Sequence, residues 1–354
     1  MNLLDKLHFP IKVNHLIIQK ITEIEKFKGK WESLALSDKD YLKELRQLAT
    51  IQSIGSSTRI EGSQLSDEEI KILIDNLEIN HLQTQDQQEV VGYWETLTLI
   101  QDNATEIELS ERFIHQLHGL LLKYSEKDSS QRGQYKKSSN QVVATYPDGV
   151  QKIIFNTTAP HLVKNEMESL LDWTNEQLTL KEINSLLVIG TFIYEILSIH
   201  PYHDGNGRLS RLLTTLMLVK EKYFFEQYVS FEHIIEDRKK EYYQVLMDCQ
   251  KNRYTENETI GNWLLFFLDC ILSLSQQLDN KLIRIMQNNE YINERQNQIL
   301  RFIEKKGKAR VKEIFENAGN TALVTIKKDL RQLLNKKLLQ KEGVGKATTY
   351  FIFK

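Results

Sequence analysis

The twelve residues His200-Pro-Tyr-His-Asp-Gly-Asn-Gly-Arg-Leu-Ser-Arg211 lie between two strongly apolar segments. The segment before them, 185–199, is almost continuously apolar, and the segment after them, 212–219, is apolar again. A helix that is apolar on most of its faces is a buried helix. The pattern therefore predicts two core helices joined by a short polar loop, an arrangement that holds functional groups rigidly.

The backbone of this loop suits an anion. Pro201 cannot continue a helix, so the first helix is expected to end near His200. Gly205, Asn206 and Gly207 tolerate positive φ, so successive N–H groups can point into one concavity. The second helix starts at the same place, and its N-terminus adds partial positive charge. Together these features predict a site for phosphate.

The side chains of the loop add ionisable groups to this site. Arg208 and Arg211 are three residues apart, so both guanidinium groups can face the anion from one side of the second helix. Asp204 is the type of ligand that Mg²⁺ prefers when it also holds phosphate oxygens. His200 can accept a proton near neutral pH, whereas His203 is expected to be an exposed loop residue. The set suits chemistry at a phosphate ester; taken alone, Asp-Gly and Asn-Gly would mark ordinary turns.

The whole string resembles the Fic family motif, His-Pro-Phe-x-Asp/Glu-Gly-Asn-Gly-Arg-x-x-Arg, with Tyr202 in place of Phe. The resemblance implies a mainly α fold, a Fic-type helical bundle with a β-hairpin flap. It also implies protein adenylyltransferase activity, the transfer of AMP from ATP to a Ser, Thr or Tyr hydroxyl of a protein with release of pyrophosphate.

The resemblance also assigns roles to the loop residues. His200 would deprotonate the target hydroxyl, and Asp204 would hold Mg²⁺ on the α- and β-phosphates. The two arginines would bind the β- and γ-phosphates. The implied nucleotide-binding residues of the loop are Gly205, Asn206, Gly207, Arg208, Leu209, Ser210 and Arg211.

An earlier stretch, Ser57-Thr-Arg-Ile-Glu61-Gly62, resembles the Fic inhibitory motif, Ser/Thr-x-x-x-Glu-Gly/Asn. The resemblance implies an N-terminal inhibitory helix at about 50–62. Its glutamate, Glu61, would pair with Arg211 and displace the γ-phosphate. A carboxylate can do this because it occupies the guanidinium that the phosphate needs.

Residues 131–160 interrupt the helical pattern. The runs 141–145 and 150–155 are typical of strands and are joined by Tyr-Pro-Asp-Gly, which predicts a hairpin. In Fic proteins a hairpin flap holds the target segment by strand addition; the implied flap residues are Lys152, Ile153, Ile154 and Phe155. Just before the hairpin, Gly133-Gln-Tyr135 resembles the Gly-x-Tyr-Arg of the family, but Lys136 replaces the arginine.

Two further groups have both a functional and a structural interpretation. His115 and His118 could share a metal because they are three residues apart, but a role in the core or on the surface is the simpler interpretation. The segment 241–246 resembles the Fic helix that closes over the adenine, which makes Tyr242, Tyr243 and Gln250 candidate nucleotide contacts. Aromatic residues on a helix are also typical of a core.

Composition bounds the class of protein. The chain has 354 residues and only four prolines, which indicates two or three mainly helical domains. Cys249 and Cys270 lie in apolar surroundings and are expected to be buried thiols. No signal peptide and no apolar run of membrane-spanning length is found, so a cytoplasmic location and no membrane partner are expected.

The last 64 residues differ in charge from the rest. Residues 291–354 hold 15 Lys and Arg against 6 Asp and Glu, whereas the whole chain has a net charge of −2. Their pattern predicts three helices followed by two strands around Gly-Val-Gly, which resembles a winged helix-turn-helix. Polar residues of the third helix, Thr325, Lys327, Lys328 and Arg331, could face DNA. Protein contacts or a homodimer are the alternative for this domain.

The predicted organisation is an N-terminal helical region (1–110), a Fic domain (111–270), a linker helix (271–290) and a winged helix-turn-helix domain (291–354). Three functional hypotheses remain open. The chain is an adenylyltransferase that Glu61 inhibits, and its target is another protein or itself. Alternatively it is a nucleotide-sensing DNA-binding regulator, or it removes AMP with Glu61 positioning water.

Overall fold

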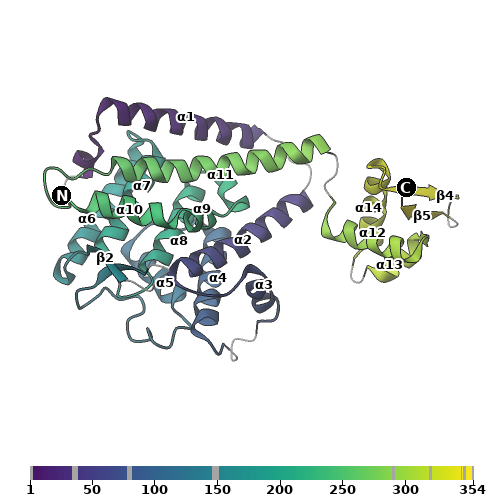
Figure 1. Cartoon of the computed structure of the whole chain (residues 1–354), viewed down its shortest axis with the longest axis horizontal. Coiled ribbons are helices and arrows are strands. Elements are labelled where there is room, and N and C mark those ends of the chain that lie inside the picture. Colours follow the sequence, from purple (N-terminus) through teal and green to yellow (C-terminus); the bar gives the residue numbers. More distant parts are fainter. Residues whose placement is uncertain are drawn as a thin grey trace. The chain divides into compact units, whose positions relative to one another are not determined.

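The computed structural model describes residues 3–33, 39–77, 82–145, 151–288, 292–318, 321–343, 345 and 348–352. The chain forms two compact units, one of Met1–Ala35 and Leu45–Leu278 and one of Leu36–Glu44 and Asp279–Lys354. Helices dominate both units (Figure 1). The predicted mainly helical fold is therefore confirmed.

The first unit consists of helices arranged around two central ones, with a two-stranded hairpin. Helices α2 and α11 each contribute residues to both units. In chain order the elements are η1 (Leu3–Leu7), α1 (Ile11–Ser33), α2 (Lys39–Glu61), α3 (Asp67–Asp75), α4 (Gln85–Asn103), α5 (Glu111–Leu121), β1 (Gln141–Thr145), β2 (Gln151–Asn156), α6 (Pro160–Leu180), α7 (Ser185–Ile199), α8 (Asn206–Lys220), η3 (Phe224–Tyr228), α9 (Phe231–Asp237), α10 (Lys239–Gln250) and α11 (Gly261–Asn288).

The two central helices are α7 and α8. Nearly every side chain of both helices is buried. They pack against each other, α6 packs against α7, and α4 and α5 pack against α8. Because both helices are apolar on several faces, they can bury surface on all sides. The predicted pair of core helices is confirmed.

The junction between α7 and α8 is tightly turned. His200 caps α7 in the left-handed region, with φ 51° and ψ 62°. This conformation is uncommon for a residue with a side chain and costs energy. Gly205, with φ 81°, precedes the first residue of α8. The loop is therefore held in one conformation by the two buried helices on either side.

The hairpin is antiparallel and pairs Gln141 with Asn156 and Thr145 with Gln151. An irregularity lies between Val142 and Val143, where the register shifts. Helix α10 contacts β2. The predicted turn at Tyr146-Pro-Asp-Gly149 lies outside the described residues.

Helix α2 ends at the predicted inhibitory motif. Gly62 follows the helix with φ 115°, and Ser63 N donates to Thr58 O. A capping box begins α3: the Ser66 hydroxyl accepts from Glu69 N, and the Glu69 carboxylate accepts from Ser66 N. The end of α2 is therefore fixed by local hydrogen bonds on both sides of the turn.

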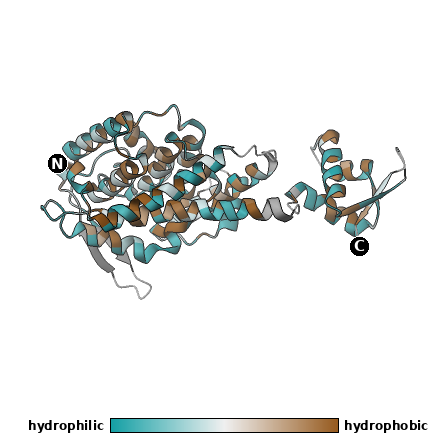
Figure 2. Cartoon of the chain, turned by 90° about the horizontal axis from the view of Figure 1, so that it is seen from above, coloured by the Kyte–Doolittle hydropathy of each residue, from teal (hydrophilic) through white to brown (hydrophobic). Residues whose placement is uncertain are grey.

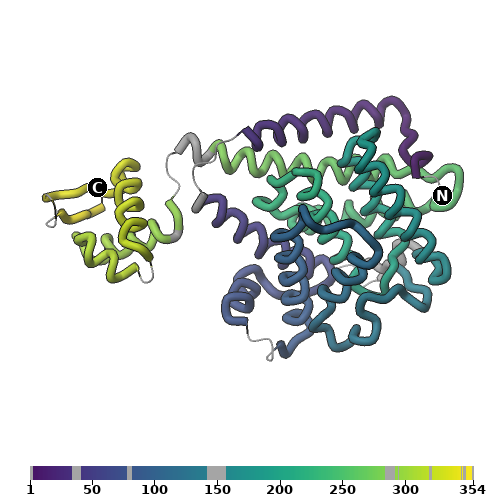
Figure 3. The backbone as a smooth tube through the Cα atoms, turned by 180° about the vertical axis from the view of Figure 1, so that it is seen from behind, coloured from purple at the N-terminus to yellow at the C-terminus, as the bar shows by residue number. Residues whose placement is uncertain are grey.

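Helix α1 runs beside the first part of α11, as the purple and green segments show in two opposite views (Figures 1 and 3). Lys20 of α1 pairs with Asp269 of α11. A Cβ atom on Gly261 would meet Val13 at 3.3 Å, so the start of α11 lies close to α1. Among the described helices, none combines the length and the apolar character that a membrane span requires.

The second unit contains the end of α11 and a small α/β fold. Its elements after α11 are α12 (Glu294–Lys306), β3 (Ala309–Arg310), α13 (Val311–Asn317), α14 (Leu323–Asn335), β4 (Leu339–Glu342) and β5 (Thr349–Ile352). The strand order is β3-β5-β4. Three helices and a sheet in this order match the predicted winged helix, with β3 as a short third strand that the sequence did not predict.

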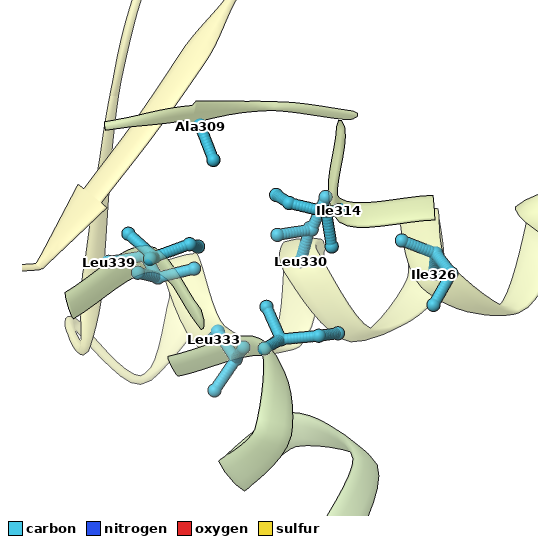
Figure 4. Packing of buried hydrophobic residues seen from close by; sticks show 8 residues of the cluster. Ala309, Ile314, Ile326, Leu330, Leu333 and Leu339 are labelled. Atoms are coloured by element: carbon cyan, nitrogen blue, oxygen red, sulfur yellow. The ribbon is translucent and has the colours of Figure 1, made fainter. Parts of the chain in front are cut away.

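The core of this unit is a single apolar cluster. Its helices carry both hydrophobic and hydrophilic residues (Figure 2), as expected for helices that bury one face. The buried side chains converge between the helices and the sheet (Figure 4). They are Ile299, Ile303, Ala309, Ile314, Ile326, Leu330, Leu333 and Leu339.

Residues 271–288 of the predicted linker helix are part of α11, which begins at Gly261. The domain limits at residues 110, 270 and 290 remain predictions. Both cysteines, Cys249 and Cys270, are free and buried, as expected.

Candidate active site

His200 directly follows α7. Its Nδ1 atom lies 3.4 Å from the carbonyl oxygen of Leu197, so a proton on Nδ1 would face that carbonyl and leave Nε2 able to accept another. Burial lowers the pKa of His200 to about 4, and the charge of Lys136 acts in the same direction. The imidazole is therefore neutral near pH 7, which is the state that a general base requires.

The side chain of Asn206 holds the loop together. Tyr202 N donates to Asn206 Oδ1 at 2.9 Å, and Asn206 Nδ2 donates to Tyr202 O at 2.8 Å. Asn140 Nδ2 donates to the same carbonyl at 2.9 Å. Because the side-chain amide of Asn206 is occupied by Tyr202, the main-chain N–H of Asn206 is the group that can face an anion.

Two histidines of α5 support the ring of Tyr202. The His118 ring stacks on it with centroids 3.7 Å apart, and the Tyr202 hydroxyl lies 2.8 Å from His115 Nδ1. Gly133 N donates to His118 Nδ1 at 2.9 Å, so Nε2 donates to Asp204 O at 3.0 Å. Burial lowers the pKa of His118 to about 4, which agrees with this neutral state.

These contacts give His115 and His118 a structural role and show how the loop accommodates Tyr202 in place of the Phe of the Fic motif. A buried hydroxyl needs a partner, and His115 supplies one for Tyr202. Among the described residues, no group of three or more His, Cys, Asp or Glu could hold a metal. The structural interpretation of His115 and His118 is therefore the better one.

Asp204 lies at the start of α8 with 37% of its side chain exposed. Its Oδ1 accepts from Gly205 N at 2.6 Å, and its Oδ2 lies 3.1 Å from Lys127 Nζ. Burial raises the pKa of this carboxyl, but the charges of Arg208 and Lys127 outweigh burial and hold it below its ordinary value. Asp204 is thus an ionised carboxylate within reach of solvent.

Arg208 is almost completely buried. Its Nη1 atom lies 2.9 Å from Glu89 Oε2, and its Nη2 atom lies 3.4 Å from Asp204 Oδ1. Within the described part of the chain, its buried Nε has no hydrogen-bond partner. Glu89 itself is held by α4, which packs on α8. Arg208 is therefore neutralised by two carboxylates.

Arg211 joins the loop to the end of α2. Its Nη2 donates to Glu61 Oε1 at 2.6 Å and to Ser57 O at 3.0 Å, and its Nε donates to Ser57 Oγ at 2.8 Å. The two residues of the predicted inhibitory motif thus contact the same guanidinium. Behind Ser57, the hydroxyl of Tyr93 donates to the buried Glu232 at 2.9 Å.

The Glu61 carboxylate also lies against the first turn of α8. A Cβ atom on Gly207 would be 2.3 Å from Glu61 Oε1, so only glycine allows this approach. Burial pushes the pKa of Glu61 upward, but the charges of Arg211 and Arg208 outweigh it and hold the pKa below its ordinary value. The carboxylate is therefore an anion at the helix N-terminus, where a phosphate would also be stabilised.

The last turn of α2 is anchored on two sides. Arg59 donates to both oxygens of Glu236, at 2.8 and 3.1 Å, and to Asp67 Oδ1 at 2.9 Å. Lys239 donates to Ile60 O at 2.7 Å. These contacts fix the position of Glu61 without involving its side chain.

The remaining predicted nucleotide contacts lie on α8 and α10. Leu209 is fully buried, and the Ser210 hydroxyl donates to Gly207 O at 2.8 Å. Tyr243 is half-buried, and its pKa is raised by burial and by the charge of Glu61. The buried Gln250 amide donates to Ser198 Oγ on α7. Nucleotide binding by these residues remains a prediction.

The predicted flap residues Lys152, Ile153, Ile154 and Phe155 all lie on strand β2. Their side chains are outside the part of the structure that is described. The backbones of β1 and β2 pair in antiparallel orientation, as the predicted hairpin requires.

Sequence reasoning did not find Glu89, Lys127 and Asn140, which complete the site. Each comes from a distant segment and approaches the loop only through the fold. Glu89 follows a capping box at Thr84, which predicts the helix but not its partner. No local pattern in the sequence marks these three residues.

On the second unit, the predicted DNA-facing residues lie on α14. Lys327, Lys328 and Arg331 are exposed, and Thr325 is half-buried. The opposite face of α14 carries Ile326, Leu330 and Leu333 into the core.

Comparison with known proteins agrees with both units. Residues 108–218 match the Fic/DOC family, and residues 295–346 match the DeoR-like helix-turn-helix domain. Protein adenylyltransferase fic-1 of Caenorhabditis elegans is 32% identical over 66 residues, which are 19% of this chain and 13% of that protein. The chain thus matches only a small part of this relative's length.

Solved structures share the fold. A Fic family protein from Desulfovibrio desulfuricans G20 has a TM-score of 0.68 at 21% identity, with 95% of each chain covered. A Fic domain containing signaling protein from Bacteroides thetaiotaomicron VPI-5482 has a TM-score of 0.59 at 24% identity, covering 72% of this chain and 94% of that one. This chain therefore carries a Fic/DOC family domain joined to a DeoR-like helix-turn-helix domain.

Proposed function

We propose that this protein is an adenylyltransferase that transfers AMP from ATP to a hydroxyl of a protein, and that Glu61 inhibits it. The observation that carries the proposal is the contact of Arg211 with Glu61 at 2.6 Å beside the start of α8. One carboxylate there occupies both the guanidinium and the helix N-terminus that a terminal phosphate would need.

His200 supplies the base in this proposal. Its neutral imidazole accepts the proton of the target hydroxyl, and the hydroxyl oxygen then attacks the α-phosphorus of ATP. The bond from that phosphorus to the bridging oxygen breaks, and pyrophosphate leaves. The low pKa of His200, about 4 because of burial, keeps the imidazole in its accepting form at neutral pH.

The start of α8 supplies charge stabilisation. Asn206 and Gly207 contribute main-chain N–H groups at a helix N-terminus, whereas Gly205 N donates to Asp204 Oδ1 and would have to exchange this contact for phosphate. Arg211 adds a guanidinium once Glu61 leaves. Groups of this kind stabilise the charge that develops on phosphate oxygens, and removing one typically costs about 3–4 kcal/mol of transition-state stabilisation.

Asp204 fits the metal role that the family implies. It is ionised and partly exposed, and Mg²⁺ bound with phosphates commonly takes one or two carboxylates. Mg²⁺ there would neutralise phosphate charge. Lys127, 3.1 Å from Asp204 Oδ2, would have to give up this contact.

The test uses labelled ATP and the purified protein. Glu61→Gly is expected to increase self-modification about 10- to 100-fold, in the range of typical coupling free energies. Glu61→Gln keeps the size of the side chain but removes its charge, so an intermediate increase would show that charge contributes to inhibition. Adding His200→Ala to Glu61→Gly is expected to abolish transfer. If Glu61→Gly transfers no label from any nucleoside triphosphate, the enzyme proposal is wrong.

The same variants address removal of AMP from a modified protein. If Glu61 positions water for that reaction, wild type would release AMP from a modified target and Glu61→Gly would not. Wild type that releases no AMP excludes this alternative.

We also propose that the second unit binds duplex DNA through α14, because Lys327, Lys328 and Arg331 are exposed on one helix of a helix-turn-helix domain. Each phosphate contact contributes to the dependence of binding on salt. Replacing the three with Gln in the full chain is expected to weaken DNA binding at least about tenfold and to reduce the salt dependence. Lys305→Gln on α12 is the control. Binding by wild type that does not depend on salt contradicts the proposal.

A further inference from the structure

Lys136 is a buried lysine beside the active site, with 4% of its surface exposed. Its ammonium group has three N–H donors, and the structure provides three acceptors. Nζ donates to Asn140 Oδ1 at 2.8 Å, to Thr157 Oγ1 at 2.7 Å and to Ile199 O at 3.1 Å. Every donor of this lysine is therefore used inside the protein.

The three acceptors come from three different places in the chain. Asn140 is the residue before β1, Thr157 is the residue after β2, and Ile199 is the last residue of α7. The strands pair at this end, Gln141 with Asn156. Lys136 thus binds both ends of the hairpin and the carbonyl group immediately before His200.

Further hydrogen bonds join the same segment to the loop around His200 and to the hairpin. Lys136 N donates to Pro201 O at 2.9 Å, so the main chain of this residue holds the other side of His200. Asn140 Nδ2 donates to Tyr202 O at 2.9 Å, and the Thr157 hydroxyl lies 2.9 Å from Asn140 O. His200, with its left-handed backbone, is therefore bracketed by contacts to one short segment.

We propose that Lys136 is a positioning residue that fixes the hairpin relative to His200, so that a target segment lying along the hairpin presents its hydroxyl at the base. This proposal rests on the adenylyltransferase function for its catalytic consequence. Its structural consequence is that one ammonium group holds the hairpin, and this can be tested by a measurement that does not depend on enzymatic activity.

The charge of Lys136 contributes in a second way. It lowers the pKa of His200, whereas the carboxylates of Glu61 and Asp204 raise it. The pKa of Lys136 is itself lowered to about 8 by burial, against the opposing charge of Glu166. The ammonium form is thus present at pH 7 and is lost as the pH rises through about 8.

The first test measures hydrogen exchange of the hairpin strands by mass spectrometry. Lys136→Met keeps the length of the side chain and removes the donors, so exchange in β1 and β2 is expected to increase at least about tenfold, the effect of losing hydrogen bonds to a charged group. Lys137→Met is the matched control, because Lys137 is the exposed neighbour. Equal exchange in the two variants overturns the proposal.

A second variant covers the case in which Lys136→Met does not fold. Thr157→Val keeps the shape of the side chain and removes the hydroxyl that accepts from Lys136. It is expected to increase exchange of the strands while leaving exchange of α7 and α8 unchanged. Unchanged exchange in the strands of Thr157→Val, together with failed folding of Lys136→Met, would show that the lysine is needed only for stability, which contradicts the proposal.

The catalytic test uses the Glu61→Gly background. Lys136→Met is expected to reduce the maximal rate of label transfer about 10- to 100-fold, because small displacements of reacting groups cost this much. The ATP concentration that gives half the maximal rate is expected to change less than about twofold, because Lys136 does not touch the start of α8. Lys136→Arg keeps the charge and is expected to recover most of the rate.

The pH profile separates positioning from general destabilisation. With Lys136 the rate is expected to decline above about pH 8, and with Lys136→Arg it is expected to stay level, because a guanidinium keeps its proton. If Glu61→Gly shows no transfer at all, the proposed function fails, and hydrogen exchange still decides the role of Lys136. A maximal rate for Lys136→Met equal to that of Lys137→Met contradicts the catalytic part.

Discussion

The two arginines at the start of α8 are both paired with glutamates, but the pairs differ in exposure. Arg211 and Glu61 expose 4% and 32% of their side chains, whereas Arg208 and Glu89 expose 2% and 8%. Opening a buried pair leaves a charge without solvent, while a partly exposed carboxylate can return to water. We therefore expect the Arg211 pair to open more readily than the Arg208 pair.

The helices that supply the glutamates support this difference. Glu89 lies in the first turns of α4, directly before the buried Val90 and Val91. Glu61 is the last residue of α2, and Gly62 with φ 115° follows it. The backbone at the end of α2 is anchored, but the partly exposed Glu61 side chain can rotate away from Arg211, whereas the Glu89 side chain is buried in a packed helix.

The largest expected effect follows from removing the buried partner. Glu89→Ala leaves Arg208 with Asp204 alone, at 3.4 Å. Losing one partner of a buried pair typically costs about 3–5 kcal/mol of unfolding free energy. Because Asp204 remains, about 3 kcal/mol is expected, which corresponds to a decrease in Tm of roughly 6–12 °C for a domain of this size. Thermal unfolding measures the shift.

Two variants sharpen this comparison. Glu61→Ala removes the partly exposed partner and leaves the buried Arg211, but Ser57 still accepts two hydrogen bonds from Arg211 and solvent reaches the place of the carboxylate. The unfolding free energy is therefore expected to fall by about 1–2 kcal/mol, less than for Glu89→Ala. Glu176→Ala, at an exposed position of α6, controls for the loss of any surface glutamate. Equal Tm shifts for Glu89→Ala and Glu61→Ala would show that the two pairs do not differ as proposed.

The sequence predicts contacts between neighbouring residues better than contacts between residues that are far apart in the chain, and the two arginine pairs illustrate this. The apolar segments, Pro201 and Gly205 act through local sterics, so the helix-loop-helix could be predicted. Ser57 and Glu61 were found because their spacing resembles a known motif. Glu89 and Lys127 belong to ordinary helical or loop sequence, and only packing of α4 and the 122–140 segment on α8 brings them to Arg208 and Asp204.

The same reasoning applies to the fold. Helices with strong periodicity were predicted in both units, and so was the hairpin with its turn signals. Strand β3 has two residues, Ala309 and Arg310, which is too short for an alternating pattern. It exists because β5 supplies its pairing partners, Tyr350 for Ala309 and Thr349 for Arg310, from a distant part of the chain, and such pairing has no local signal.

A smaller effect is expected from the second contact of Arg211. Ser57→Ala removes the hydroxyl that accepts from Arg211 Nε at 2.8 Å but keeps the main-chain acceptor. One hydrogen bond contributes about 1 kcal/mol, so self-modification is expected to increase about fivefold. Ser56→Ala is the matched control, because the Ser56 hydroxyl lies near His233 and Arg59 instead. A similar increase in both variants would indicate that α2 is loosened generally.

The smallest expected effect is that of lowering the pH on inhibition by Glu61. Pairing holds the pKa of Glu61 below its ordinary value, so the pair is complete above the pKa of a free carboxyl and is lost only as the pH falls through the lowered value. His200, with a pKa of about 4, also keeps its neutral form over this range. The ratio of transfer rates, Glu61→Gly over wild type, is therefore expected to stay constant from pH 8 to about pH 5 at fixed ionic strength. A ratio that declines towards 1 between pH 7 and about pH 5 would mean that Glu61 takes up a proton there. In that case the pair with Arg211 would be weaker than its geometry indicates, and acid alone would open the site.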